Sequence, residues 1–94
     1  MNIQVRSVHS IAKIISGRKI NIEIPDSSTL NGLLHELTRS FGQEFYDAVC
    51  DETGYPENKV AILINGTSAG VLGGVSVPLK DGDDVLILPI ISGG

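Results

Sequence analysis

Ile20-Asn21-Ile22-Glu23-Ile24-Pro25-Asp26-Ser27-Ser28-Thr29-Leu30 is the stretch where the sequence changes from the period of a strand to the period of a helix. The isoleucines alternate with polar residues, which predicts a strand over 18–24 with one buried face. Pro25 to Ser28 end that strand and offer capping side chains. An apolar series with helical spacing follows, at Leu30, Leu33, Leu34, Leu37 and Phe41. The sequence therefore predicts an amphipathic helix over Thr29 to Phe41.

The residues on either side of this stretch extend the pattern. Partial alternation over Ile3 to Val8 predicts another strand, and Ser16-Gly17 supplies turn residues that would pair the two strands antiparallel as a hairpin. After the helix, Gly42 is placed for a left-handed cap. Gly32 is unfavourable inside a helix, which indicates a close approach to the sheet at that point. The pattern is weaker over 42–58, where one helical turn is expected at Glu44 to Val49.

Two more strands complete the predicted sheet. Val60 to Ile64 is strongly aliphatic and is stopped by Asn65-Gly66, while the polar turn over 80–84 leads into Val85 to Leu88. The segment between them, Thr67 to Leu79, is a looser connection. The order strand, strand, helix, strand, strand predicts an α+β fold with a mixed sheet of four or five strands. We expect the first and last strands to be adjacent and parallel in the middle, with the main helix packed on one face.

One helix covers only one face of such a sheet, so the two faces are expected to differ. The face toward the helix is predicted to bury Ile3, Val5, Ile20, Ile22, Ile24, Val60, Ile62, Ile64, Val85 and Ile87. Strand parity places an aliphatic group on the other face, at Val8, Leu63, Leu86 and Leu88. An exposed apolar patch usually marks a contact surface. The alternative is that the connection over 42–58 folds over this face.

Composition limits the classes of function. The 94 residues fit one domain, and 41% hydrophobic residues are enough to close a core. A net charge of -4 opposes a phosphate backbone, so no nucleic acid partner is expected. A single cysteine, Cys50, excludes an internal disulfide and suits a reducing compartment, which favours a cytoplasmic location. The first residues do not resemble a signal peptide, and no apolar run reaches the length of a membrane span.

The side chains do not indicate catalysis or metal binding. Cys50 with His9 or His35 lacks a third orienting group for nucleophilic catalysis. The histidines and acidic residues lack the spacing of metal ligands, so the acidic residues of 81–84 are interpreted as a structural turn. Gly70 to Gly74 resembles a phosphate-binding loop only in its glycine content. We therefore expect no metal site and no stably bound cofactor.

The end of the sequence, Leu88-Pro89-Ile90-Ile91-Ser92-Gly93-Gly94, carries the strongest functional signal. We predict a domain over residues 1–91 and a flexible tail of Ser92, Gly93 and Gly94, whose glycine tip is narrow enough to thread a channel. A carboxylate is inert toward nucleophiles at neutral pH, so chemistry at Gly94 needs activation by another enzyme. Acyl-adenylate formation from ATP is the common route. The sequence thus predicts a carrier, with the Gly94 carboxylate as its reactive group.

In order and spacing, these motifs resemble the ubiquitin-like β-grasp sulfur carriers of the MoaD/ThiS family. That family includes the small subunit of molybdopterin synthase and the thiamine sulfur carrier. The matching motifs are Val5-Arg6, Thr29-Leu30 with Leu33-Leu34, Ile64-Asn65-Gly66, Pro78 to Val85, and Leu88-Pro89 with the terminal Gly93-Gly94. The Asn-Gly pair and the proline six residues from the end are similar to the molybdopterin branch. The sequence departs from that branch at Ser7 and Val8, where large side chains are usual, and at Ile90, where a second proline is usual.

The resemblance implies a cycle of activation and sulfur transfer. An ATP-dependent enzyme of the ubiquitin-activating type would adenylate Gly94, and sulfur transfer would make a C-terminal thiocarboxylate. The tail would then enter the large subunit of molybdopterin synthase and donate its sulfur to a pterin precursor. The resemblance also implies a docking patch for both partners, made of Val8, Leu86, Leu88, Pro89, Ile90 and Ile91. The alternatives are a thiamine-type sulfur carrier, a protein modifier that forms isopeptide bonds through Gly94, and a β-grasp adaptor with an accidental diglycine.

Overall fold

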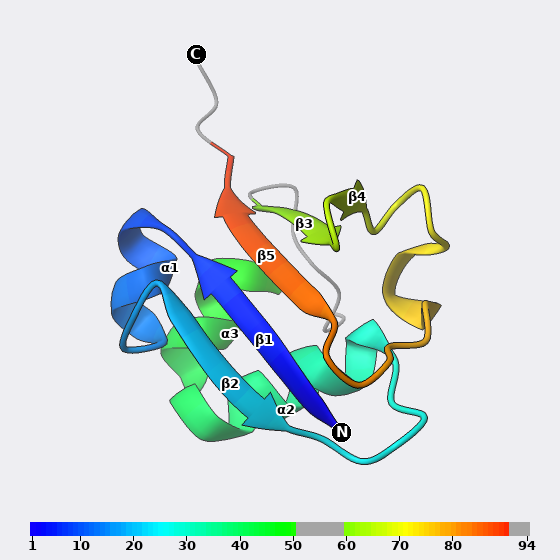
Figure 1. Ribbon diagram of the computed structural model, residues 1–94. Coiled ribbons are helices and arrows are strands. Elements are labelled where there is room, and N and C mark those ends of the chain that lie inside the picture. Colours follow the sequence, from blue (N-terminus) through cyan, green and yellow to red (C-terminus); the bar gives the residue numbers. More distant parts are fainter. Residues whose placement is uncertain (51–59, 91–94) are drawn as a thin grey trace.

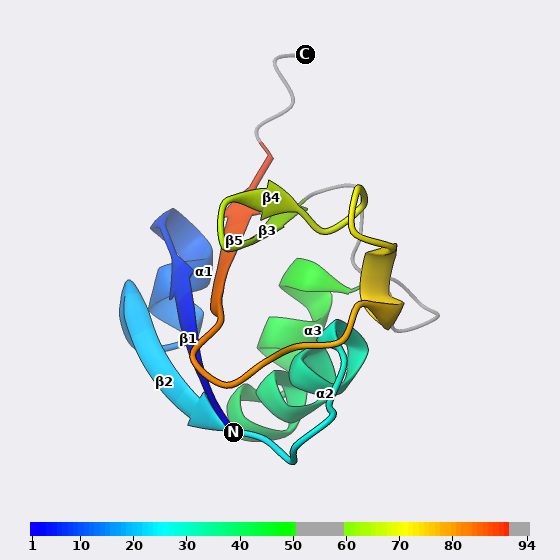
Figure 2. The same ribbon diagram turned by 45° about the vertical axis from the view of Figure 1, so that its right-hand side comes forward.

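The computed structural model describes residues 1–50 and 60–90 (Figure 1). Its elements are β1 (Asn2–Ser7), α1 (His9–Ile14), β2 (Lys19–Glu23), α2 (Leu30–Phe41), α3 (Gln43–Val49), β3 (Val60–Ile64), β4 (Thr67–Ser68), the 3-10 helix η1 (Gly74–Ser76) and β5 (Asp84–Pro89). The strands form one sheet in the order β2-β1-β5-β3-β4. β1 and β5 are parallel neighbours in its middle, and the other pairs are antiparallel (Figure 1, Figure 2). This is the β-grasp arrangement that was expected.

The first two strands pair as predicted, but the connection between them is not a simple hairpin turn. β1 and β2 are antiparallel, with Val5 opposite Ile20. Between them, α1 buries Ile11 and Ala12. This helix has only 6 residues, so its apolar face is too short to stand out as a helical period in the sequence. Val8 takes the N-cap position of α1, and for that reason β1 ends at Ser7, one residue before its predicted end.

The main helix, α2, is confirmed from its cap to its last turn. The side-chain oxygen of Thr29 accepts a hydrogen bond from the backbone N–H of Gly32 at 3.3 Å. Its inner face buries Leu30, Leu33, Leu34 and Leu37. Gly42 ends the helix with a positive φ, as predicted. Its φ is 82°, but its ψ of -165° lies outside the left-handed helical region. The close approach predicted at Gly32 is wrong, because a Cβ atom there would meet Ser28 at 3.6 Å and not the sheet.

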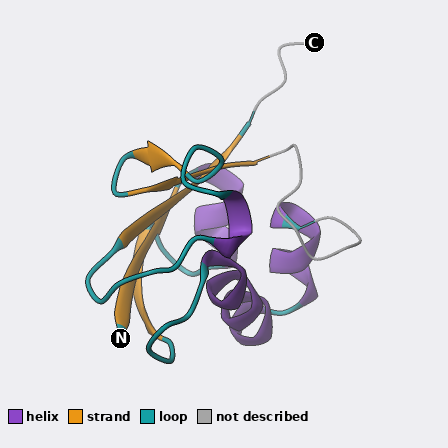
Figure 3. Cartoon of the chain, turned by 90° about the vertical axis from the view of Figure 1, so that its right-hand side faces the viewer, coloured by secondary structure: helices purple, strands orange, loops and turns teal. Residues whose placement is uncertain are grey.

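The connection after α2 begins with α3, which confirms the helical turn expected at 44–49. Phe45 and Val49 of α3 are fully buried and join the same core as α2. Figure 3 shows the sheet edge-on, with α2 and α3 on one side of it. Residues 42–50 therefore do not cover the opposite face, and the remainder of the predicted alternative cover lies outside the described residues.

The core forms between the inner face of the sheet and the helices. Eight of the ten side chains predicted for that face are buried: Ile3, Val5, Ile24, Val60, Ile62, Ile64, Val85 and Ile87. Ile20 and Ile22 are only partly buried, because β2 is an edge strand with no neighbour on its outer side. Packing against the core and hydrogen bonds to a strand on each side thus fix the positions of the central strands β1 and β5.

Candidate functional site

The sheet face opposite the helices, called here the open face, carries three of the six predicted docking residues. Leu63 on β3 and Leu86 and Leu88 on β5 are half-buried, whereas the residues between and before them on the two strands point into the core. Leu86 lies opposite Leu63 in the antiparallel pair, and Leu88 lies opposite Ala61. The three leucines therefore form one contiguous apolar strip across two strands. Such a patch on a small domain is typical of a contact surface.

Val8 lies at the same end of the open face. The parallel register pairs Arg6 with Leu86 and Ser7 with Ile87, which brings Val8 level with Leu88. Val8 itself is half-buried, as the residue between β1 and α1. The structure thus brings three of the predicted docking residues, Val8, Leu86 and Leu88, to one part of one face.

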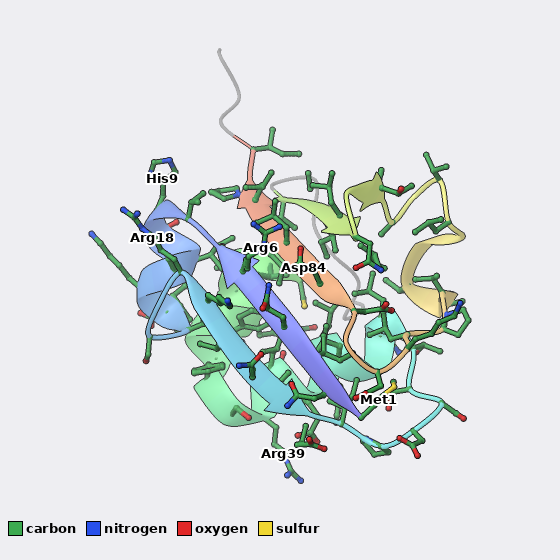
Figure 4. All side chains as sticks on the ribbon, in the orientation of Figure 1. Met1, Arg6, His9, Arg18, Arg39 and Asp84 are labelled. Atoms are coloured by element: carbon green, nitrogen blue, oxygen red, sulfur yellow. The ribbon has the colours of Figure 1, made fainter. Side chains whose placement is uncertain are left out.

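Polar side chains occupy the open face beside the apolar strip, and Asp84 is their centre. The Arg6 guanidinium donates two hydrogen bonds to the Asp84 carboxylate, at 2.8 and 2.6 Å, and the Gln4 amide donates another at 2.8 Å. The two donors of Arg6 make the forked geometry that is strongest for a carboxylate. This bonding to Arg6, helped by Gln4, holds the pKa of Asp84 below its ordinary value against the opposing effect of burial. Figure 4 shows Arg6 and Asp84 together on this face.

The acidic turn before β5 is a structural turn, as predicted. An Asp83 carboxylate oxygen accepts from the backbone N–H of Lys80 at 2.8 Å, and the Asn65 amide donates to the other at 2.9 Å. The Asn65 amide oxygen also accepts from the backbone N–H of Asp84 at 3.0 Å. Asn65 and Gly66 have φ values of 51° and 87°, which suits the two-residue hairpin between β3 and β4. These bonds tie the β3–β4 hairpin to the start of β5 and so fix the register of the apolar strip.

β5 ends where the chain turns toward its predicted tail. Pro89 is the last residue of the strand and lies opposite Val60. A proline has no N–H to donate, so it fits the end of a strand better than its middle. Ile90, the last described residue, is 51% exposed. The other predicted tail residues, Ile91, Ser92, Gly93 and Gly94, lie outside the described residues.

Sequence reasoning missed two features of this region. The first is the network of Gln4, Arg6 and Asp84, which depends on the register between the first and last strands. The second is Ser7, which is buried and donates its hydroxyl to the backbone oxygen of Ile87 at 2.6 Å. Ser7 is two residues after Val5 on the same strand, so its side chain lies on the same buried side of the sheet. This alternation could have identified Ser7 as a buried residue. Its bond fastens the end of β1 to β5 just before the last strand leaves the sheet.

The rest of the described chain offers no competing chemical centre. Residues 1–50 and 60–90 contain no group of three His, Cys, Asp or Glu side chains that could hold a metal ion. Cys50 is buried. A hollow of about 460 Å³ beside β3 and η1 is lined by apolar residues, glycines and Ser68, without a titratable side chain among the described residues of its lining. None of the helices in this part of the chain combines the length and apolar character needed to cross a membrane.

Comparisons with known proteins agree with the fold. The chain matches the model of the ThiS family over residues 10–94. Over 97 residues it is 26% identical to small archaeal modifier protein 3 of Haloferax volcanii, and 100% of each chain is covered. A solved putative molybdopterin converting factor, subunit 1, from Pyrococcus furiosus is 25% identical, with a TM-score of 0.78 over 97% of this chain and 99% of that one.

A chain of the solved BexX/CysO complex of Amycolatopsis orientalis has the same fold. It is 22% identical, with a TM-score of 0.71 over 98% of this chain and 99% of that one. The family match spans most of the sequence. This chain therefore belongs to the ThiS family of ubiquitin-like β-grasp sulfur carriers and modifiers.

Proposed function

We propose that this protein is a sulfur carrier of molybdopterin biosynthesis, the small subunit of molybdopterin synthase, and that the Gly94 carboxylate is its reactive group. One observation carries the proposal: β5 contributes two leucines to the apolar strip and, after Pro89, leads directly into the sequence that ends in Ser92-Gly93-Gly94. The docking surface and the tail are consequently parts of one stretch of chain. The full-length similarity to a putative molybdopterin converting factor subunit supports the choice of acceptor.

The proposed chemistry begins with activation of the tail. A Gly94 carboxylate oxygen attacks the α-phosphorus of ATP in an adenylating enzyme, pyrophosphate leaves, and an acyl-adenylate forms. A sulfur nucleophile at the oxidation level of sulfide then attacks the acyl carbon and displaces AMP, which leaves a thiocarboxylate. In the large synthase subunit the thiocarboxylate sulfur attacks a carbon of a pterin precursor, and an oxygen group on that carbon leaves. Water then cleaves the acyl C–S bond, which restores the Gly94 carboxylate and leaves the sulfur on the pterin. In this cycle ATP is a substrate of the activating enzyme, and the carrier itself needs no bound cofactor.

The tail and the apolar strip have separate tasks in this cycle. The strip, together with Val8, Pro89 and Ile90, gives each partner an apolar surface to bury, and Ile91 is the next apolar residue in the sequence. Gly93 and Gly94 have no side chains, so the tail is narrow enough to reach an enclosed reaction centre. Binding energy from the strip then holds the carboxylate near the reacting phosphate, which makes the attack effectively unimolecular.

A protein modifier is the second candidate. A small archaeal modifier protein is a relative of this chain, and the similarity covers the full length of both proteins. In that reaction the activated acyl group of Gly94 passes to a lysine amine of another protein, AMP leaves, and an isopeptide bond forms. Both candidates, and a thiamine-type carrier, share the adenylation of Gly94. They differ in the acceptor.

Exchange of labelled pyrophosphate into ATP by the cognate activating enzyme tests the shared step. We expect exchange with the full chain, no exchange after deletion of Gly94, and unchanged thermal stability, because the deletion removes no core residue. His35→Ala, on the exposed side of α2, is the matched control and should retain exchange. Equal exchange with and without Gly94 would refute the carrier and the modifier together.

The acceptor is identified in a second experiment. After sulfur transfer, the carrier should show an intact mass increased by the difference between sulfur and oxygen, and it should convert the pterin precursor when mixed with the large synthase subunit. A ladder of covalent adducts on a denaturing immunoblot of native cells would instead identify a modifier. Sulfur transfer to the thiamine pathway alone would identify the thiamine-type carrier.

A further inference from the structure

Charge is distributed unevenly along this acidic chain. Four of its seven Lys and Arg residues precede residue 20, whereas the first of its eleven Asp and Glu residues is Glu23. The sequence before Glu23 therefore has a positive charge, although the whole chain has a net charge of -4. Such a segregation produces a local field of opposite sign to that of the rest of the surface.

The fold gathers these cations at the end of the sheet where β5 finishes. Lys19 begins β2 opposite Arg6, and Arg18 accepts a hydrogen bond at its backbone oxygen from Ser7 at the end of β1, at 2.9 Å. Lys13 lies in the last turn of α1, which joins these two strands. Because β1 and β5 are parallel, this is also the end at which Pro89 and Ile90 leave the sheet (Figure 1). We call Lys13, Arg18 and Lys19 the basic rim.

The basic rim is exposed and forms no direct ion pair within the described part of the chain, although the charge of Lys19 helps to lower the pKa of Asp84. All three side chains are exposed, and none of the ion pairs formed among residues 1–50 and 60–90 includes them. Arg6 differs, because its charge is matched by Asp84 at 2.6 Å. Figure 4 shows Arg18 on the outer corner beside His9, well away from Asp84.

The basic rim is continuous with the apolar strip. One row across the open face runs from Lys19 through Arg6 and Leu86 to Leu63, since these residues are register partners in three successive strand pairs. An apolar centre with charged residues at its border is the usual anatomy of a protein–protein interface. The negative charge of the rest of the chain repels an acidic partner in other orientations, so the rim also selects the orientation of docking.

We infer that the basic rim docks on an acidic protein surface of the activating enzyme, beside the channel that receives the tail; the identity of this partner rests on the proposed function. The rim orients the carrier so that Ile90 points toward the channel while the apolar strip is buried. A polyanionic nucleic acid is the less favourable occupant, because the net charge of -4 repels it and the neighbouring strip is apolar.

Two charge-reversal variants with the same net charge test this inference. Lys13→Glu/Arg18→Glu alters the basic rim, and Arg39→Glu/Lys80→Glu is its matched control. Arg39 lies on α2 (Figure 4). Lys80 lies in the turn before β5, at the end of the sheet away from the basic rim, because the N–H of Gly82 in that turn donates to the backbone oxygen of Asn2 at the start of β1. All four side chains are exposed, and thermal unfolding verifies that both variants fold.

The readout is pyrophosphate exchange at several salt concentrations. At low salt, the rim variant should raise the apparent KM of the activating enzyme for the carrier roughly ten-fold with kcat unchanged, and the control should change KM less than about two-fold. Salt at about 0.5 M should remove most of the difference, because it screens exposed charges. Equal KM values for the two variants, with exchange intact in the unaltered chain, would overturn the inference alone.

Two further outcomes have distinct meanings. Absence of exchange with the unaltered chain would overturn the proposed function and, with it, the assignment of this partner. Fluorescence anisotropy with a labelled single-stranded RNA homopolymer tests the other class of occupant. RNA binding that is lost in the rim variant and kept in the control would assign the rim to nucleic acid and overturn the acidic protein surface; no binding is expected.

Discussion

Replacing Leu88 by aspartate tests the docking role of the apolar strip. Leu88 is half-buried on the open face, opposite Ala61. Complete burial of a leucine contributes about 1.5 to 3 kcal/mol. The isolated chain already buries about two thirds or more of the Leu88 side chain, so a partner that covers the rest gains about 0.5 to 1 kcal/mol. An aspartate buried there without partners costs about 1 to 3 kcal/mol in desolvation. Leu88→Asp should therefore weaken binding of the activating enzyme by about 1.5 to 4 kcal/mol, which is roughly 10- to 1000-fold in Kd.

Isothermal titration calorimetry with the cognate activating enzyme measures this change. Val71→Asp is the matched control, because Val71 is 79% exposed in the loop after β4 and undergoes the same chemical change. Its Kd should remain within about two-fold of the unaltered chain, since isolated surface substitutions have small effects. An unchanged Kd for Leu88→Asp, or an equal loss with Val71→Asp, would show that the strip does not dock. If thermal unfolding shows that Leu88→Asp is not folded, Leu88→Ala decides the question with an expected loss of affinity of about three-fold.

Two predictions concern the stability of the scaffold. Asp84→Asn should flatten the acid limb of the stability curve: the pKa of Asp84 is lowered on folding, so its contribution is complete above the unfolded value of about 3.9 and is lost as the pH falls through the folded value. Urea unfolding between pH 2 and pH 7 measures this, and parallel curves for the two proteins would contradict it. Phe45→Ala should lower the free energy of unfolding by about 3 to 5 kcal/mol, because the side chain of Phe45 on α3 is 0% exposed and packs in the core. A loss below about 1 kcal/mol in the same urea assay would mean that α3 contributes little to the core.

The elements that could be predicted are those whose signal is local. The alternation at Ile20 to Ile24 and the leucine spacing of α2 each lie within a single element, and both are confirmed. α1 was missed because a helix of one and a half turns has too few apolar positions to define a period, even though Ile11 and Ile15 are both buried. The error at Gly32 is of another kind, because a glycine in a helix does not reveal which side of it is crowded.

The apolar side chains of the open face could be predicted from the sequence, but the hydrogen bonds among its polar side chains could not. Parity alone places Leu86 and Leu88 on one side of a strand, wherever that strand lies. The bond between Arg6 and Asp84 depends instead on the alignment of the first strand with the last, which joins residues 78 positions apart. No local pattern contains that alignment. The basic rim was hidden for the same reason, since Lys13 and Lys19 are brought to the end of β5 only by the parallel pairing of β1.

The place of β5 in the sheet fixes where the last strand ends relative to the docking surface. β5 is bonded to β1 on one side and to β3 on the other, and Ser7 fastens it to β1 near its end. The end of β5 is therefore fixed relative to the apolar strip and the basic rim. In the proposed cycle, a partner that receives the tail covers the same face, so the activating enzyme and the acceptor subunit exclude one another. The carrier must dissociate between activation and sulfur transfer, and a small half-buried strip with an exposed charged rim is suited to such repeated, reversible docking.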